Sequence, residues 1–162
     1  MKLDFFSDIN KENYYILDYD RVDRFIVKAV WISAVFLAVY ALGIYFIAPA
    51  QSYPTPFSWR VISLQEVFWT IGIGLVTAIV TNLLHGRISN HYLWRFLVTN
   101  ALLIYAYLVV FISGGSIEWH FYFFVTFALL VMYSDWRLGW WAIVAVSLHH
   151  AILNFFAPQW VY

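Results

Sequence analysis

Long stretches without a charged residue constrain this chain more than any other feature. They run from Lys28 to Arg60, from Glu66 to Arg87, from Arg95 to Glu118, from Glu118 to Asp135, and from Arg137 to Tyr162. A helix that crosses the hydrocarbon core of a bilayer, roughly 30 Å thick, needs about 20 apolar residues. One such stretch would also suit a buried helix of a soluble protein. Five in succession, with short connections, predict an all-α, polytopic transmembrane helical bundle.

The composition excludes several other classes of protein. Only 11% of the residues are Asp, Glu, Lys or Arg, too few to coat a soluble domain, and 64% are hydrophobic, too many for a disordered chain. Lys and Arg balance Asp and Glu, so no nucleic-acid partner is expected. The absence of Cys from the sequence excludes disulfides, iron–sulfur clusters and thiol chemistry.

We expect five spans, and the residues between them support their limits. The spans cover about 27–48, 65–85, 94–113, 117–134 and 138–157, of which the fourth is the shortest. A proline-rich segment at 49–56 ends the first span. Ser63 and Glu66 have the spacing of a capping box before the second. Ser134 and Asp135 suit the N-terminus of the fifth.

The Lys and Arg residues indicate an orientation, because cytoplasmic loops are enriched in them. With a cytoplasmic N-terminus, only Arg60 lies outside. We expect residues 1–24 to form a cytoplasmic segment and the start of a juxtamembrane helix, and residues 25–162 to form the bundle. Apolar residues at helical spacing over 22–26 predict that the first helix begins before the membrane. Five spans leave the C-terminus outside, so we expect either a longer protein that continues beyond Tyr162 or an unusually short relative of longer proteins.

Histidines are the main ionisable residues inside the predicted spans, and such residues are functional candidates because they are costly in lipid. His120 lies about one turn into the fourth span, and His149 and His150 lie about two turns from the end of the fifth. The two spans are antiparallel, so all three histidines fall in the outer half of the bilayer. Neighbouring residues of a helix point about 100° apart, so only one of His149 and His150 is expected to share a ligand with His120.

Neutral imidazole binds zinc, copper and haem iron, so the three histidines predict a site for haem or for a transition metal, copper or zinc. Glu118, Tyr122 and Asn154 are expected to be further ligands or to orient the imidazoles. The alternative is that each histidine only hydrogen-bonds a neighbouring helix. His85 and His91 lie at the inner edge of the second and third spans, where an interfacial position is expected.

The C-terminal third carries motifs that resemble those of a known family. The chain reads S-G-G-S-I-E-W-H-F-Y-F-F from Ser113, Y-S-D-W from Tyr133 and L-H-H from Leu148. This resembles the membrane-embedded sensory region at the N-terminus of some bacterial methyl-accepting chemotaxis proteins, diguanylate cyclases and sensor histidine kinases, with the pattern S-G-G-x-I-E-x-H-F-H-F-F, Y-x-D-W and L-H-H. The matching residues are Ser113, Gly114, Gly115, Ile117, Glu118, His120, Phe121, Phe123, Phe124, Tyr133, Asp135, Trp136, His149 and His150. The chain departs from the pattern at Tyr122, where the family usually has a second His, so Tyr122 either replaces a ligand or alters the site.

The resemblance implies a six-span protein of the bacterial inner membrane, a homodimer with a cytoplasmic signalling module such as a diguanylate cyclase or a kinase. The chain would then be the sensor or input domain. A ligand, a redox change, or a metal or haem at the histidines would shift helix packing, and a sixth span would transmit the shift.

Two other functions are compared with this one. An enzyme is not expected, because H-E-x-x-H, the multi-histidine boxes of membrane enzymes and a recognisable nucleophile–base pair are absent from the sequence. The alternative to a sensor is a small integral membrane subunit of a transporter or other membrane complex, in which the histidines are structural.

Overall fold

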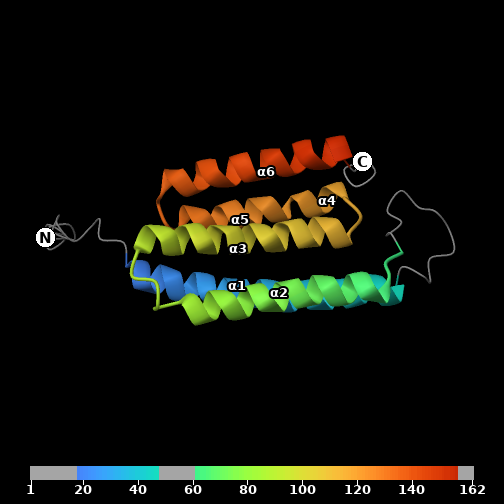
Figure 1. Cartoon of the computed structure of the whole chain (residues 1–162), viewed down its shortest axis with the longest axis horizontal. Coiled ribbons are helices and arrows are strands. Elements are labelled where there is room, and N and C mark those ends of the chain that lie inside the picture. The colour runs from blue at the N-terminus through green and yellow to red at the C-terminus, as the bar shows by residue number, and fades with distance from the viewer. Residues whose placement is uncertain (1–17, 48–60, 157–162) are drawn as a thin grey trace, which may run out of the picture.

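The computed structural model describes residues 18–47 and 61–156 and shows an all-α bundle (Figure 1). Its helices are α1 (Tyr19–Ile47), α2 (Leu64–Leu84), α3 (His91–Ile112), α4 (Ile117–His120), α5 (Tyr122–Val131) and α6 (Trp136–Phe156). The helices run alternately in opposite directions, and α4 and α5 follow each other in one pass. By length and composition, α1, α2, α3 and α6 can each cross a membrane. The predicted fold class is therefore confirmed.

The helix limits agree with the predicted spans except in the first and fourth passes. The helix α1 begins at Tyr19, ahead of the predicted span, because the apolar spacing over 22–26 continues its buried face. The proline-rich segment 49–56 and the ends of the chain lie outside the described residues.

Local signals in the sequence account for the starts of α2 and α3. The Ser63 hydroxyl accepts a hydrogen bond from the backbone N–H of Glu66 at 3.2 Å, and the Glu66 carboxylate accepts one from the backbone N–H of Ser63 at 2.7 Å. The predicted capping box is therefore present. The Asn90 side chain accepts two backbone N–H groups of the first turn of α3, both at 3.0 Å. These bonds satisfy donors that have no partner within a helix.

The fourth pass differs from the single span predicted over 117–134. It is interrupted at Phe121, whose N–H bonds to the carbonyl of Glu118 at 3.3 Å, while the N–H of Phe124 bonds to the carbonyl of Phe121 at 3.0 Å. Bonds between residues three apart belong to a tighter turn than the α-helix, so they divide the pass into α4 and α5. The α-helical part ends at Val131, which makes this the shortest pass.

Helix α3 is central and α6 is peripheral. In the most apolar stretch of α3, 56% of the residues are buried, against 12% for α6. Tyr105 of α3 is fully buried, and its hydroxyl donates to the backbone carbonyl of Gly74 in α2 at 2.6 Å. A Cβ at Gly74 would lie only 2.9 Å from Cδ2 of Leu37 in α1. The first three helices therefore pack closely, whereas α6 lies along one side of the bundle (Figure 1).

A polar network closes the end of the bundle where α1 begins. The Tyr133 hydroxyl donates to the buried carboxylate of Asp23 at 2.9 Å. The guanidinium of Arg95 lies 3.7 Å from the ring centroid of Tyr19, and its Nη1 lies 4.0 Å from Oδ2 of Asp135. Asp135 also accepts a backbone N–H of the first turn of α6 at 3.1 Å, as its predicted capping role requires. The network joins α1, α3 and the turn between α5 and α6.

Candidate functional site

The three predicted histidines lie together at the other end of the bundle. His120 is the last residue of α4, and His149 and His150 lie near the end of α6. The rings of His120 and His150 are stacked, with centroids 5.3 Å apart and planes 18° apart. The rings of His149 and His150 are 5.6 Å apart and nearly perpendicular, at 73°. His150 is therefore the member of the α6 pair that faces His120 directly.

The hydrogen bonds of these imidazoles determine which nitrogens are available to a ligand. Nδ1 of His120 lies 3.1 Å from the backbone carbonyl oxygen of Ser116. A carbonyl can only accept, so in the neutral ring Nδ1 carries the proton and Nε2 keeps a free lone pair. Nε2 of His149 is buried, and it has no hydrogen-bond partner in the described part of the chain. The cluster therefore offers ring nitrogens that the protein itself does not use.

Two aromatic rings support the cluster. Tyr107 of α3 stacks on His149, with centroids 4.5 Å apart and planes 22° apart. Phe123 of α5 is buried, 6.3 Å from the ring of His149 and 6.4 Å from that of His120. Sequence reasoning missed Tyr107, because one tyrosine in an apolar helix carries no signal until helix depths are known. From the sequence, Phe123 was identified only as a residue that matches the family motif, without a role at the histidines.

The other predicted ligands are not brought to the imidazoles. The Tyr122 hydroxyl donates to the hydroxyl of Ser33 in α1 at 2.8 Å, and the ring stacks on Phe36 at 5.9 Å. Glu118 and Asn154 are exposed. Over residues 18–47 and 61–156, none of the three makes a hydrogen bond or ring contact with the imidazoles.

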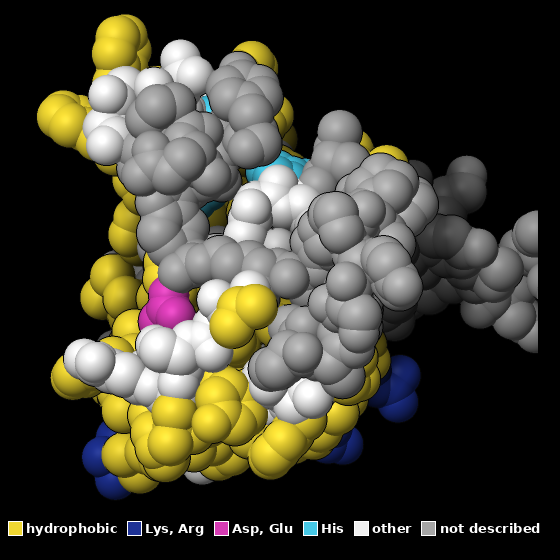
Figure 2. Space-filling model, turned by 90° about the vertical axis from the view of Figure 1, so that its right-hand side faces the viewer, with side chains coloured by type: hydrophobic (Ala, Val, Ile, Leu, Met, Phe, Trp, Pro, Cys, Tyr) yellow, Lys and Arg dark blue, Asp and Glu magenta, His cyan; other side chains and the backbone are white. Residues whose placement is uncertain are grey.

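The stacked rings are not in a metal-binding arrangement. A metal ion needs ring nitrogens that converge on a point about 2 Å from each. Lone pairs lie in the ring planes, so the stacked rings hold their lone pairs in nearly parallel planes 5.3 Å apart at the ring centroids. In the described ranges, no group of three or more His, Asp or Glu residues is arranged to hold a metal ion. Coordination would require the side chains to rotate. The site faces the end of the bundle seen in Figure 2, where histidine surface is visible.

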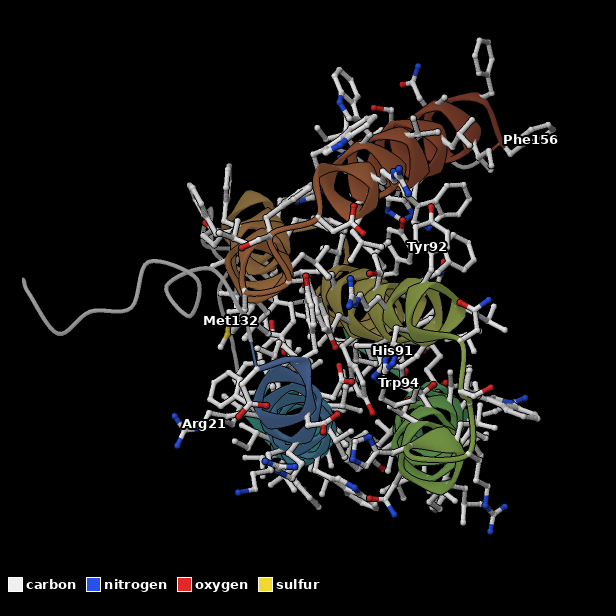
Figure 3. The ribbon with its side chains drawn as sticks, turned by 90° about the vertical axis from the view of Figure 1, so that its left-hand side faces the viewer. Arg21, His91, Tyr92, Trp94, Met132 and Phe156 are labelled. Carbon is white, nitrogen blue, oxygen red and sulfur yellow. The ribbon has the colours of Figure 1, made fainter. Side chains whose placement is uncertain are left out.

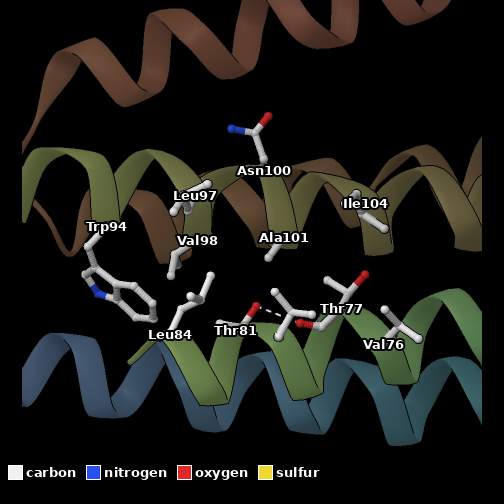
Figure 4. Close-up of a pocket in the computed structure, with 11 residues that line it drawn as sticks. Val76, Thr77, Thr81, Leu84, Trp94, Leu97, Val98, Asn100, Ala101 and Ile104 are labelled. Atoms are coloured by element: carbon white, nitrogen blue, oxygen red, sulfur yellow. Dashed lines mark hydrogen bonds between the residues drawn. The ribbon is translucent and has the colours of Figure 1, made fainter. Parts of the chain in front are cut away.

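An apolar groove between α2 and α3 offers no comparable chemistry. It has a volume of about 290 Å³ and includes Thr77 and Thr81 in its lining (Figure 4). Their hydroxyls donate to carbonyls of their own helix, at 2.8 Å for Thr77 and 2.7 Å for Thr81. Both threonine hydroxyls are therefore already satisfied, and the groove is a surface suited to lipid.

Comparisons with known proteins add no family. No protein-family model matches the chain, and no curated protein and no solved structure matches it. The resemblance to bacterial sensory regions stays a prediction, and the geometry of the histidine cluster is the basis for a functional proposal.

Proposed function

We propose that the chain is the membrane-embedded sensor, or input domain, of a bacterial signal transduction protein, and that it detects a transition metal ion, copper or zinc, at His120, His149 and His150. The observation that carries the proposal is the 5.3 Å contact between the rings of His120 and His150. This contact joins α4 to α6, the least buried of the long helices.

The position of α6 explains how occupancy would become a signal. Few packed side chains hold α6 to the bundle, so a bond across the α4–α6 contact changes its preferred position at low cost. The two stacked rings must turn to point their nitrogens at one ion, so the occupied and empty arrangements differ at this contact. An ion that binds one arrangement tenfold more tightly shifts the balance by about 1.4 kcal/mol. Helix α6 would pass the shift to a sixth span and a cytoplasmic module in a homodimer.

The same geometry favours an ion over a haem. Two axial histidines bind haem iron through ring edges, with the porphyrin between them. His120 and His150 meet by their faces, 5.3 Å apart. A single ion needs only side-chain rotation, and the free Nε2 atoms suit it.

The distribution of charge supports a cytoplasmic N-terminus in the inner membrane. The Lys and Arg residues of the described part gather toward the end where α1 begins: Arg21, Arg24, Lys28, Arg87, Arg95 and Arg137. Positive residues are concentrated on the cytoplasmic side of membrane proteins. This orientation puts the histidine cluster in the outer leaflet.

A second candidate is a structural subunit of a transporter or other membrane complex. The close stacking of Tyr107 on His149, at 4.5 Å, favours it, because an imidazole can serve as a packing group between helices.

Metal loading separates the two candidates. The purified chain would be incubated with copper or zinc, freed of excess ion, and assayed for bound metal. In a separate sample, its visible spectrum would be recorded after incubation with haem. The sensor proposal predicts bound metal in the wild type, a loss in His120→Ala and His150→Ala, and no loss in the control His85→Ala at the opposite end. A folded wild-type chain that retains neither copper nor zinc would overturn it, whether or not it binds haem.

A further inference from the structure

A second polar cavity lies at the end of the bundle where α1 begins, far from the histidine cluster. It has a volume of about 420 Å³, is partly open, and is bordered by the start of α1, the turn between α2 and α3, and the start of α3. Its charged and polar lining includes Asp20, Asp23, Arg24, His85, His91 and Trp94. Figure 3 looks at this end and shows His91 and Trp94 between the ribbons of α1, α2 and α3. The volume is in the range of small-molecule sites.

Two buried polar atoms of the lining have no hydrogen-bond partner among the residues that the structure describes. Trp94 is 4% exposed, and its Nε1 makes no hydrogen bond within the described residues. Figure 4 shows this nitrogen on the side of the ring that faces the end where α1 begins, while the six-membered ring faces the groove between α2 and α3. The Tyr133 hydroxyl is a polar neighbour but does not complete a hydrogen bond with it. Nδ1 of His85 is also buried, and no described residue forms a hydrogen bond with it. Buried polar groups in folded proteins are nearly always paired, so these two point to a ligand.

The charges around these atoms define the ligand further. Asp20 and Asp23 are one helical turn apart on α1, and Arg24 follows directly. Within residues 18–47 and 61–156, Asp23 is engaged only through Oδ1, by the Tyr133 hydroxyl at 2.9 Å. Carboxylates beside a guanidinium and an indole N–H suit a zwitterion that carries an ammonium group and an anionic oxygen.

We propose that this cavity binds phosphoethanolamine. Asp20 and Asp23 receive the primary ammonium, and Arg24 and Nε1 of Trp94 donate to phosphate oxygens. The cavity lies where α1, α2 and α3 reach the end of the bundle, which is the depth of lipid head groups. Phosphoethanolamine occurs both as a lipid head group and as a soluble molecule, and both sources present the same chemistry. The inference does not depend on metal binding at the histidines.

The test uses the full chain in nanodiscs of phosphatidylcholine, to which phosphatidylethanolamine is added in increasing amounts. Native mass spectrometry measures the lipid that stays bound. Choline has no N–H to donate to the carboxylates. The affinity of the wild type for the ethanolamine lipid should therefore be about tenfold higher than for the choline lipid, which is the effect of one hydrogen bond to a charged group. Asp20→Asn and Trp94→Phe should each remove most of that preference. The matched control is Trp141→Phe, since the indole of Trp141 donates to Asn100 at 3.2 Å, outside the cavity.

A competition experiment distinguishes the two sources. If soluble phosphoethanolamine displaces the bound lipid, or if it binds and the lipid does not, the soluble molecule is the ligand. If only the lipid binds, the head group is the ligand. Asp20 is exposed, so Asp20→Asn tests the proposal even if Trp94→Phe fails to fold. Equal retention of both lipids without binding of soluble phosphoethanolamine overturns the proposal, and so does a preference that survives in both variants.

Discussion

The close approach of α1, α2 and α3 at Gly74 leads to a quantitative prediction for Gly74→Ala. A Cβ there would lie 2.9 Å from Cδ2 of Leu37 and 3.5 Å from Cε1 of Tyr105. Both side chains are fully buried, so neither can move away freely. Overpacking of this kind costs about 1–3 kcal/mol. Alanine is favoured over glycine inside a helix by about 1 kcal/mol, which offsets part of the cost.

Gly72→Ala is the matched control. Gly72 lies in the same helix, and a Cβ there would meet no atom within 4 Å. The gain in helix propensity is common to both variants, so their difference isolates the contact with Leu37 and Tyr105. We expect Gly74→Ala to have a free energy of unfolding about 1–3 kcal/mol below that of Gly72→Ala. The assay is the loss of helical circular dichroism during titration with sodium dodecyl sulfate in mixed micelles. Equal stability of the two variants would refute the packing described at Gly74.

Three further predictions concern the polar groups. Tyr133→Phe leaves the buried Asp23 without the hydroxyl that donates to it, so it should lower the free energy of unfolding by about 1.5–3 kcal/mol. The control Tyr92→Phe, at an exposed position, should leave the free energy of unfolding unchanged. Equal effects of the two variants in the same detergent titration would contradict this prediction. Asn90→Ala removes the cap of α3 and should cost about 1 kcal/mol, measured in the same way, and an unchanged midpoint would argue against the cap. Zinc binding at the histidine cluster should weaken as the pH falls, because only the neutral imidazole is a ligand. If equilibrium dialysis gave a zinc affinity independent of pH, zinc would not be bound through these imidazoles.

The number of passes was predictable because a charged side chain in lipid costs so much free energy that the gaps between charged residues mark the spans. The antiparallel order then placed His120 and the α6 histidines at the same depth, and the 100° step between His149 and His150 predicted that they would differ in their relation to His120. These inferences use only helix geometry and the sequence.

The break at Phe121 had no comparable signal. No proline or glycine lies at that position, so the sequence carries no local signal for the tighter turns that the hydrogen bonds show there. The tyrosine partners were equally hidden. The hydroxyls of Tyr105, Tyr122 and Tyr133 reach groups that are 31, 89 and 110 positions away in the chain. Such pairs depend on the rotation of each helix about its axis, which an almost uniformly apolar sequence does not specify.

The most direct test of the sensor proposal measures whether metal at the histidines moves α6. The sequence contains no cysteine, so Phe124→Cys in α5 and Ile152→Cys in α6, both at exposed positions, accept a pair of spin labels. Pulsed electron resonance then gives the distance distribution between α5 and α6 with and without zinc. We expect zinc to shift or narrow the distribution, and His150→Ala to abolish that effect. An unchanged distribution in a chain that has bound zinc would contradict the account.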